Sequence, residues 1–392
     1  MVGVGAVAAL LVVASMLNDP SGDPIGGPAG TPTVTTSADA TASVQETSEP
    51  SEGEPKPSPA ITDIPGLLAV NRDGELWVRR ADGSDLRLLT SELDGGGWPI
   101  AWLLDGSRLV IASLDGDNRY AATLSLVDPS TGEVADLGVV FPTYSPMTWS
   151  PDGTRLAFGG DGGPGSGIVV LDMRDGGFTQ LTHDGGHGYD AVNGPMWSPD
   201  GSLIAYQAFD GTSNDVLVVS VEDGTVTSPA PDQTDDYPLR WVSVNGQFKL
   251  VFGSFRGTNE NKFDARPWIV NVDGSELQLL DGSGIVTSAD PQPQRYPSPD
   301  GRWVAESCDA GVCISNAGGD LPLYAIPDTR GWTIADIGLS WVPGGDYVVY
   351  HVLTPEDRRA VVAILLPNGD PITLTPEGIS EAFPAWQPVP EE

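Results

Sequence analysis

The chain has 392 residues, and its 54 acidic residues against 19 basic ones give a net charge of −35 at pH 7. A surface of that sign repels phosphate backbones and anionic membrane surfaces, and no cluster of Lys or Arg offsets it, so the composition argues against nucleic acid as a partner. The length exceeds an average domain but fits a single large β fold.

The first predicted element covers residues 1–17, MVGVGAVAALLVVASML, which carry no charge and end before Asn18-Asp19-Pro20. This length is at the short end for a membrane-spanning helix, and no basic region of the kind found in secretory signals precedes it. We therefore predict an uncleaved transmembrane signal-anchor over residues 1–18, with a removed signal peptide as the alternative.

Residues 19–62 are rich in Pro, Ser, Thr and Gly and contain no aromatic residue. Such a segment cannot bury enough apolar surface to offset the entropy lost on ordering, so we predict a disordered linker. Anchor, linker and a globular head over residues 63–392 together predict a single-pass protein of the cell membrane, with its head on the extracytoplasmic side.

An internal repeat runs through the predicted head. Its anchor positions are Trp102, Trp149, Trp197, Trp241, Pro297, Trp341 and Trp386. Their spacings are 47, 48, 44, 56, 44 and 45 residues, which is the length of one four-stranded propeller blade.

Each repeat predicts four strands separated by turn signals. The run that ends at the anchor predicts the first strand, Pro-Asp-Gly predicts a tight turn, and a second Asp-Gly or Asn-Gly precedes the fourth strand. The chain contains fifteen Asp-Gly pairs. We therefore interpret most of its aspartates as turn formers.

The two ends of the head complement each other. Residues 67–90 match a repeat only from the second strand onward, and residues 383–388 match only the first strand. Together they predict one blade of three strands from the start and one from the end, which closes the ring and hides its edges. The prediction is an all-β, seven-bladed propeller, with six or eight blades as alternatives; the weakest unit follows Trp241, where VNGQ replaces SPDG.

The segments WSPDGTRLAF at Trp149–Phe158 and WSPDGSLIAY at Trp197–Tyr206 resemble the repeat of TolB-like (WD40-like) propellers. The resemblance covers about residues 64–388 and implies the fold. The family includes envelope-binding proteins, propeller halves of prolyl-oligopeptidase-type enzymes and sugar-acid lyases, so the resemblance leaves the function open. No α/β domain of the TolB kind is recognised before the repeats.

Cys308 and Cys313 flank a short turn between two strand-like runs. Cross-strand partners there can come within disulfide reach, so we predict a disulfide between them, with two free thiols as the alternative. No His or further Cys lies nearby to complete a four-ligand metal site.

Catalytic motifs are sparse. The sequence has no Gly-x-Ser-x-Gly nucleophile elbow, and its histidines are His183, His187 and His351. His183 and His187 share a Gly-rich loop, which we interpret as a polar loop and not as a metal or catalytic site. Asp232, Asp235 and Asp236 do not follow the order of a calcium loop, so we interpret them as solvated turns. We predict no catalytic residue, metal or cofactor.

Loops that join successive blades, together with the loops between second and third strands, should surround one mouth of the channel. We call this side the mouth face. Convergent aromatic and polar groups in a concavity are typical of ligand sites, and the candidates here are Trp98, Tyr144, His187, Tyr189, Asp190, Asp235, Tyr237, Arg240, Arg295, Trp332 and Asp336, joined by Glu381 and Phe383. Alternatively, Trp98, Trp332 and Phe383 only pack between blades.

These features predict a non-catalytic propeller with a monomeric head. We expect it to bind a protein or small ligand at its mouth, as a sensor or envelope-assembly component. A lyase or hydrolase acting on glycans is one alternative, for which His187 is the candidate residue. A passive structural display head is the other.

Overall fold

The computed structural model describes residues 60–90, 97–115, 118–143, 146–161, 166–183, 192–209, 211–232, 234–256, 265–280, 295–308, 311–316, 324–326, 338–354, 358–367 and 369–389. The predicted anchor, and the predicted linker up to residue 59, lie outside these ranges. Within the ranges, no helix combines the length and apolar character needed to cross a membrane.

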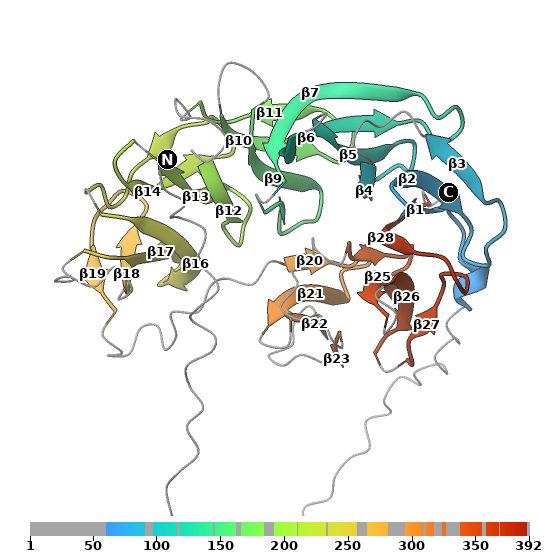
Figure 1. Ribbon diagram of the computed structural model, residues 1–392. Helices are drawn as coiled ribbons and strands as arrows, with labels where there is room; N and C mark the ends of the chain where they lie inside the picture. The colour runs from blue at the N-terminus through green and yellow to red at the C-terminus, as the bar shows by residue number, and fades with distance from the viewer. Residues whose placement is uncertain are drawn as a thin grey trace, which may run out of the picture. The chain divides into compact units, whose positions relative to one another are not determined.

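Seven four-stranded antiparallel sheets form the fold, as predicted, and each is one propeller blade (Figure 1). Blade 1 contains β28 (Glu381–Trp386), β1 (Leu68–Arg72), β2 (Glu75–Arg79) and β3 (Arg87–Thr90). Blade 2 contains β4 (Gly97–Trp102), β5 (Leu109–Asp115), β6 (Asn118–Val127) and β7 (Val134–Pro142). Blade 3 contains β8 (Thr148–Trp149), β9 (Arg155–Gly160), β10 (Gly167–Asp172) and β11 (Phe178–Gln180). Blade 4 contains β12 (Val192–Trp197), β13 (Leu203–Phe209), β14 (Asn214–Ser220) and β15 (Val226–Thr227).

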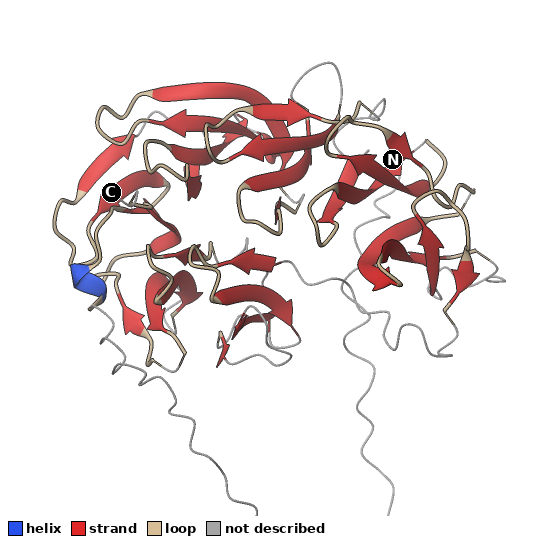
Figure 2. Cartoon of the chain, turned by 180° about the vertical axis from the view of Figure 1, so that it is seen from behind, coloured by secondary structure: helices blue, strands red, loops and turns tan. Residues whose placement is uncertain are grey.

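Blade 5 contains β16 (Asp236–Val244), β17 (Gln247–Ser254), β18 (Arg266–Asn271) and β19 (Gln278–Leu279). Blade 6 contains β20 (Arg295–Pro297), β21 (Trp303–Cys308), β22 (Gly311–Asn316) and β23 (Tyr324–Ala325). Blade 7 contains β24 (Ser340–Trp341), β25 (Tyr347–Leu353), β26 (Arg359–Leu365) and β27 (Ile372–Thr373). In the part of the chain that is described, the one helical element is a short 3₁₀ turn, η1 (Ile61–Asp63), drawn in blue in Figure 2. All seven repeat anchors lie on first strands.

The ring closes through blade 1 as the sequence predicts. Strand β28 from the end of the chain pairs antiparallel with β1, with Leu68 opposite Trp386 and Arg72 opposite Glu381. Ile61 and Ile64 are buried beside this seam in a cluster with Trp386. Packing of the head thus begins at Ile61, two residues before the predicted boundary.

A buried ion-pair network joins the two halves of blade 1, and we call it the seal. Glu381 and Arg79 are fully buried, and Arg79 Nη2 lies 2.8 Å from Glu381 Oε2. Arg72 also pairs with Glu381, and the Thr375 hydroxyl donates to Oε2 at 2.9 Å. Burial alone would raise the pKa of Glu381, but the hydrogen bond and charge of Arg79 outweigh burial, and the pKa is lowered.

The Ser-Pro-Asp-Gly turns share one hydrogen-bond pattern, seen for example in blade 4. The Ser198 hydroxyl donates to Asp200 Oδ1 at 2.7 Å and accepts the backbone N–H of Leu203 at 2.9 Å. Asp200 Oδ1 also accepts the backbone N–H of Ser202 at 3.1 Å. Equivalent bonds recur around Asp152 and Asp300, which supports the interpretation of these aspartates as turn formers.

The unit after Trp241 is a complete blade despite its missing Ser-Pro-Asp-Gly. Asn245 and Gly246 have φ values of 53° and 77°, as a type I′ hairpin turn requires, and they join β16 to β17 directly. A different turn therefore replaces the usual one without loss of a strand.

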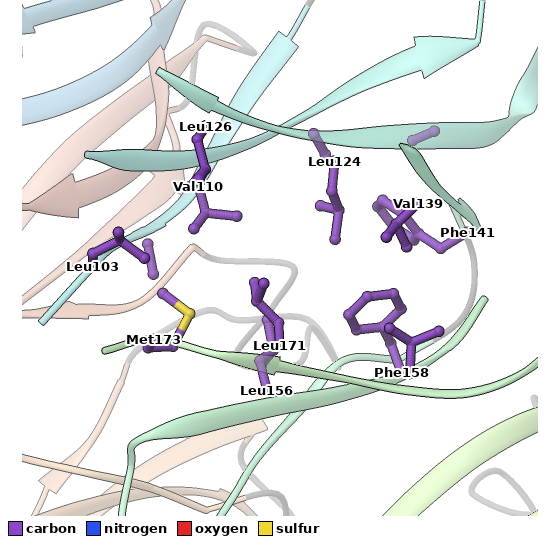
Figure 3. Close-up of a cluster of buried hydrophobic side chains, with 14 residues drawn as sticks. Leu103, Val110, Leu124, Leu126, Val139, Phe141, Leu156, Phe158, Leu171 and Met173 are labelled. Atoms are coloured by element: carbon purple, nitrogen blue, oxygen red, sulfur yellow. The ribbon is translucent and has the colours of Figure 1, made fainter. Parts of the chain in front are cut away.

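Neighbouring blades bury apolar side chains against one another. Between blades 2 and 3, Leu124 and Val110 face Leu156, Leu171 and Phe158 (Figure 3). Since successive side chains of a strand point to opposite faces, a blade can pack on both of its neighbours. Apolar clusters of this kind join blades 1 to 5 in order, blade 6 to blade 7, and blade 7 to blade 1.

The anchor tryptophans also connect blades through a repeated hydrogen bond. In four of them the indole N–H donates to a backbone carbonyl of the preceding blade, and the acceptor is the residue just before that blade's anchor. The pairs are Trp102 to Ala385 (2.9 Å), Trp197 to Thr148 (3.0 Å), Trp241 to Met196 (3.1 Å) and Trp341 to Tyr296 (3.2 Å). At the seam Trp386 donates instead to Pro65, at 2.9 Å, which fastens the segment before β1. Trp149 stacks on Tyr296 of blade 6, with ring centroids 4.7 Å apart.

Candidate functional site

The predicted ligand-binding residues fall into two groups. Tyr144, His187, Tyr189, Asp190, Trp332 and Asp336 lie outside the described residues. Five are described: Trp98, Tyr237 and Arg295 lie near the mouth-face ends of first strands, Asp235 precedes β16, and Arg240 lies in the middle of β16.

Trp98 belongs to an aromatic group at the junction of blades 7, 1 and 2. Its ring lies 6.4 Å from the ring of Phe383 on β28, which in turn meets the ring of His351 on β25 edge-on at 4.9 Å. His351 is buried, and its Nδ1 accepts the backbone N–H of Phe383 at 3.2 Å. Trp98 and Phe383 therefore pack between blades, as the alternative interpretation expected. The guanidinium of Arg359 lies 5.3 Å above the Phe383 ring.

A cavity of about 380 Å³ opens beside this aromatic group, and we call it the junction cavity. It lies between blades 7 and 1, and its lining residues are Asn71, Asp73, Leu353, Arg359, Ser380 and Ala382. Every one of them stands at a second-to-third strand turn or next to the connection into β28, so the cavity is on the mouth face. Its size is within the range of small-molecule sites.

The sequence predictions missed Arg359, Asp73 and Ser380. Arg359 ends a second-to-third strand loop and Asp73 lies in a second-to-third strand turn. Both positions belong to the second-to-third strand loops that were expected at the mouth. Asp73 was not chosen because, as part of an Asp-Gly pair, it was interpreted as a turn former. Glu381, by contrast, was expected at the mouth and is fully buried in the seal, so it serves the fold.

Asp235 joins blades 4 and 5, whereas Tyr237 packs within blade 5. Asp235 Oδ1 accepts the backbone N–H of Asn214 at 2.9 Å and its side-chain N–H at 3.1 Å. The Tyr237 ring covers Gly253 so closely that a β-carbon there would come within 2.4 Å of the ring, and burial raises the pKa of Tyr237. Arg240, half-buried on β16, follows a register shift in the same strand.

Arg295 lies apart from that pair. It begins β20 in blade 6, its side chain is about half exposed, and its Nε is 3.3 Å from Glu306 on the neighbouring strand. The described candidates thus occupy separate blade junctions instead of one shared cluster.

Three carboxylates, from Asp215, Asp232 and Asp236, gather at the junction of blades 4 and 5, with their ligand atoms within 4.8 Å of one another. Arg256 Nη2 lies 2.6 Å from Asp236 and 3.1 Å from Asp232. Asp236 is fully buried, so its interpretation as a solvated turn residue was wrong. Burial raises the pKa of Asp236 to about 6, against the opposing hydrogen bond of Ser254 and the charge of Arg256.

Cys313 is buried on β22 and is disulfide-bonded. In the pairing of β21 with β22, Cys313 lies opposite Glu306 and Cys308 opposite Gly311. The side chain of Cys308 lies outside the described residues, so the bond between Cys308 and Cys313 stays a prediction.

A second cavity, of about 740 Å³, lies at the seam, on the side of the first-to-second strand turns. Pro65, Leu67, Gln387 and Val389 contribute to it from both ends of the described chain. The side chain of Gln387 bridges Leu67 and Gly106 by hydrogen bonds of 3.1 and 2.8 Å. This cavity therefore marks where the chain enters and leaves the ring.

No family model and no curated protein matches the chain. Among solved structures, it is similar to TolB from Acinetobacter baumannii, at 18% identity over 83% of this chain and 69% of that one, with a TM-score of 0.37. It is similar to a protein described as TolB from Agrobacterium tumefaciens, at 17% identity over 83% of this chain and 91% of that one, with a TM-score of 0.27. It is also similar to a puromycin-hydrolysing peptidase from Mycobacterium tuberculosis, at 16% identity over 80% of this chain, with a TM-score of 0.38, and spans about half (54%) of that peptidase. These similarities concern the fold alone.

Proposed function

We propose that this chain is a membrane-anchored, extracytoplasmic, non-catalytic propeller that binds a ligand at its mouth face. The observation that carries the proposal is the junction cavity, a polar concavity of about 380 Å³ beside the aromatic group of Trp98, His351 and Phe383. Polar and charged groups that line a preformed concavity, held by a rigid sheet scaffold, can orient a ligand.

The cellular placement is supported by two features. Residues 1–17 are uncharged and mostly apolar, which suits a membrane anchor. Cys313 is disulfide-bonded, and structural disulfides persist in oxidising compartments outside the cytoplasm. Membrane fractionation, followed by protease treatment of intact cells, tests this placement: the head should stay with the membrane and be cleaved from outside.

A glycan-active lyase or hydrolase remains the alternative function. Its strongest feature would be Asp236, because a carboxyl with a raised pKa is what a general acid needs. Asp236 is fully buried and paired with Arg256, however, so it offers no surface to a glycan. The observed geometry thus favours binding over catalysis.

Binding at the junction cavity is testable with the full-length protein in detergent. Thermal unfolding would be measured with a panel of amino acids, short peptides, and neutral and acidic oligosaccharides. We expect one class to raise the unfolding midpoint, and Arg359→Gln to abolish that rise. Arg358→Gln is the matched control, since Arg358 is an exposed neighbour that does not line the cavity.

Two results would count against the proposal. If no compound in the panel shifts the midpoint, the passive display head becomes the better description. If a compound shifts wild type, Arg358→Gln and Arg359→Gln equally, the ligand binds elsewhere.

A further inference from the structure

The junction cavity carries one positive and one negative side chain, Arg359 and Asp73. Within the described part of the chain, neither of them forms an ion pair with the other or with a third residue. Opposite charges that line one cavity without meeting are complementary to a ligand that carries both charges. This reasoning rests on the proposed function and specifies its ligand.

We propose that the junction cavity binds a small zwitterion of the α-amino-acid class, with the ligand carboxylate on Arg359 and its ammonium group on Asp73.

The guanidinium of Arg359 is positioned to bind a carboxylate. Its guanidinium stacks 5.3 Å above the Phe383 ring, and its backbone N–H donates to Ser380 Oγ at 3.2 Å. Phe383 is itself fixed by the bond from its backbone N–H to His351. A guanidinium stacked on a ring keeps its N–H edge available, and that edge matches a carboxylate in a bidentate arrangement.

The carboxylate of Asp73 is positioned to bind an ammonium group. Asp73 and Gly74 have φ values of 54° and 91°, in the tight turn between β1 and β2. Asn71 secures this turn, because its Oδ1 accepts the Gly74 N–H at 3.3 Å and its side-chain N–H donates to Gly97 of blade 2. The turn therefore fixes the backbone of Asp73, and from this position its exposed side chain lines the cavity.

The rest of the lining selects the ligand's side chain. Leu353 is half-buried and Ala382 is buried, and both are apolar. A neutral, apolar side chain suits these two surfaces, whereas a second charge would be left without a partner. Leucine is accordingly the probe of choice.

Isothermal titration calorimetry on the full-length protein in detergent would compare L-leucine, L-leucinamide and N-acetyl-L-leucine. The amide lacks the carboxylate and the acetylated compound lacks the ammonium group. We expect each to bind roughly 10-fold or more weakly than L-leucine, because each loses a charge-assisted hydrogen bond.

Two variants assign each charge to its residue. Arg359→Gln should weaken L-leucine strongly and leave L-leucinamide nearly unchanged. Asp73→Asn should weaken L-leucine and leave N-acetyl-L-leucine nearly unchanged, and Asn tolerates the positive φ of this turn. Asp85→Asn is the control for the second, because Asp85 is also an exposed aspartate with positive φ (55°) and lies outside the cavity.

The proposal is overturned if L-leucine does not bind, or if the free, amidated and acetylated compounds bind alike. It is also overturned if both variants weaken all three compounds equally. If L-leucine does not bind but another class of compound from the thermal-unfolding panel does, and Arg359→Gln abolishes that binding, the proposed function stands and the assignment of a zwitterionic ligand is wrong.

Discussion

Replacing Glu381 by Gln should destabilise the ring at its seam. The substitution keeps the size of the side chain and one oxygen acceptor, but removes the charge that faces Arg79 and Arg72. Arg79 would then be a fully buried cation with only neutral acceptors, which are the Gln amide oxygen and backbone carbonyls such as that of Leu374 at 3.1 Å.

The size of the effect follows from burial. Removing one partner of a buried ion pair costs about 3–5 kcal/mol, since the remaining charge stays desolvated. The described head extends from Ala60 to Val389. With an unfolding entropy of about 2.1 cal/mol/K per residue over ~330 residues, that cost lowers the unfolding midpoint by roughly 4–7 °C.

The assay is thermal unfolding followed by circular dichroism, with Arg302→Gln as the control. Arg302 also joins two blades, through Asp346 at 2.8 Å, but its side chain is half exposed. An exposed pair contributes about 0–1 kcal/mol, so the control should shift the midpoint by no more than about 1–2 °C.

The seal should also respond to pH in a definite direction. The pKa of Glu381 is below its ordinary value in the folded state, so its contribution is complete above that ordinary value and is lost as pH falls through the folded-state pKa. Wild type and Glu381→Gln should therefore converge in stability in acid. Equal melting of Glu381→Gln and Arg302→Gln at neutral pH would refute the reasoning.

Two further predictions concern the blade junctions. Trp197→Phe keeps the ring but deletes the donor to Thr148, and should cost about 1 kcal/mol in chemical denaturation, whereas Trp268→Phe should cost less because its indole N–H has no hydrogen-bond partner among the described residues. Asp236 has a raised pKa, so its contribution favours the folded state at low pH and is lost as pH rises through about 6. Wild type should gain stability relative to Asp236→Asn, by about 1 kcal/mol, between pH 7 and pH 5, and a constant difference would contradict the assignment.

The blade pattern was predictable because it depends on interactions between residues that are close together in the sequence. A Ser-Pro-Asp-Gly turn is stabilised by residues at most five positions apart, as in the bonds from Ser198 to Asp200 and Leu203. The closure was predictable for a similar reason. Comparison with a complete repeat shows that residues 67–90 lack a first strand and that residues 383–388 supply only a first strand. Even the irregular unit after Trp241 keeps a recognisable hairpin signal in Asn245-Gly246.

The site residues were much less predictable. The contact between Trp98 and Phe383 agrees with the alternative that they pack between blades. Loop positions in the sequence could not show that Glu381 is buried or that Asp236 meets Arg256. Six of the eleven candidates fall outside the described residues, and there the expectation stays a prediction.

The sequence by itself determined the repeat, the turns and the way in which the ring closes, and it favoured seven blades over six or eight. Tertiary structure decided which charges meet: Arg79 and Glu381 are 302 positions apart and form the seal, whereas Asp73 and Arg359 line one cavity without pairing. The reason is physical. Turn and strand preferences depend on neighbours along the chain, but the partner of a charged side chain depends on which blades adjoin once the ring has closed.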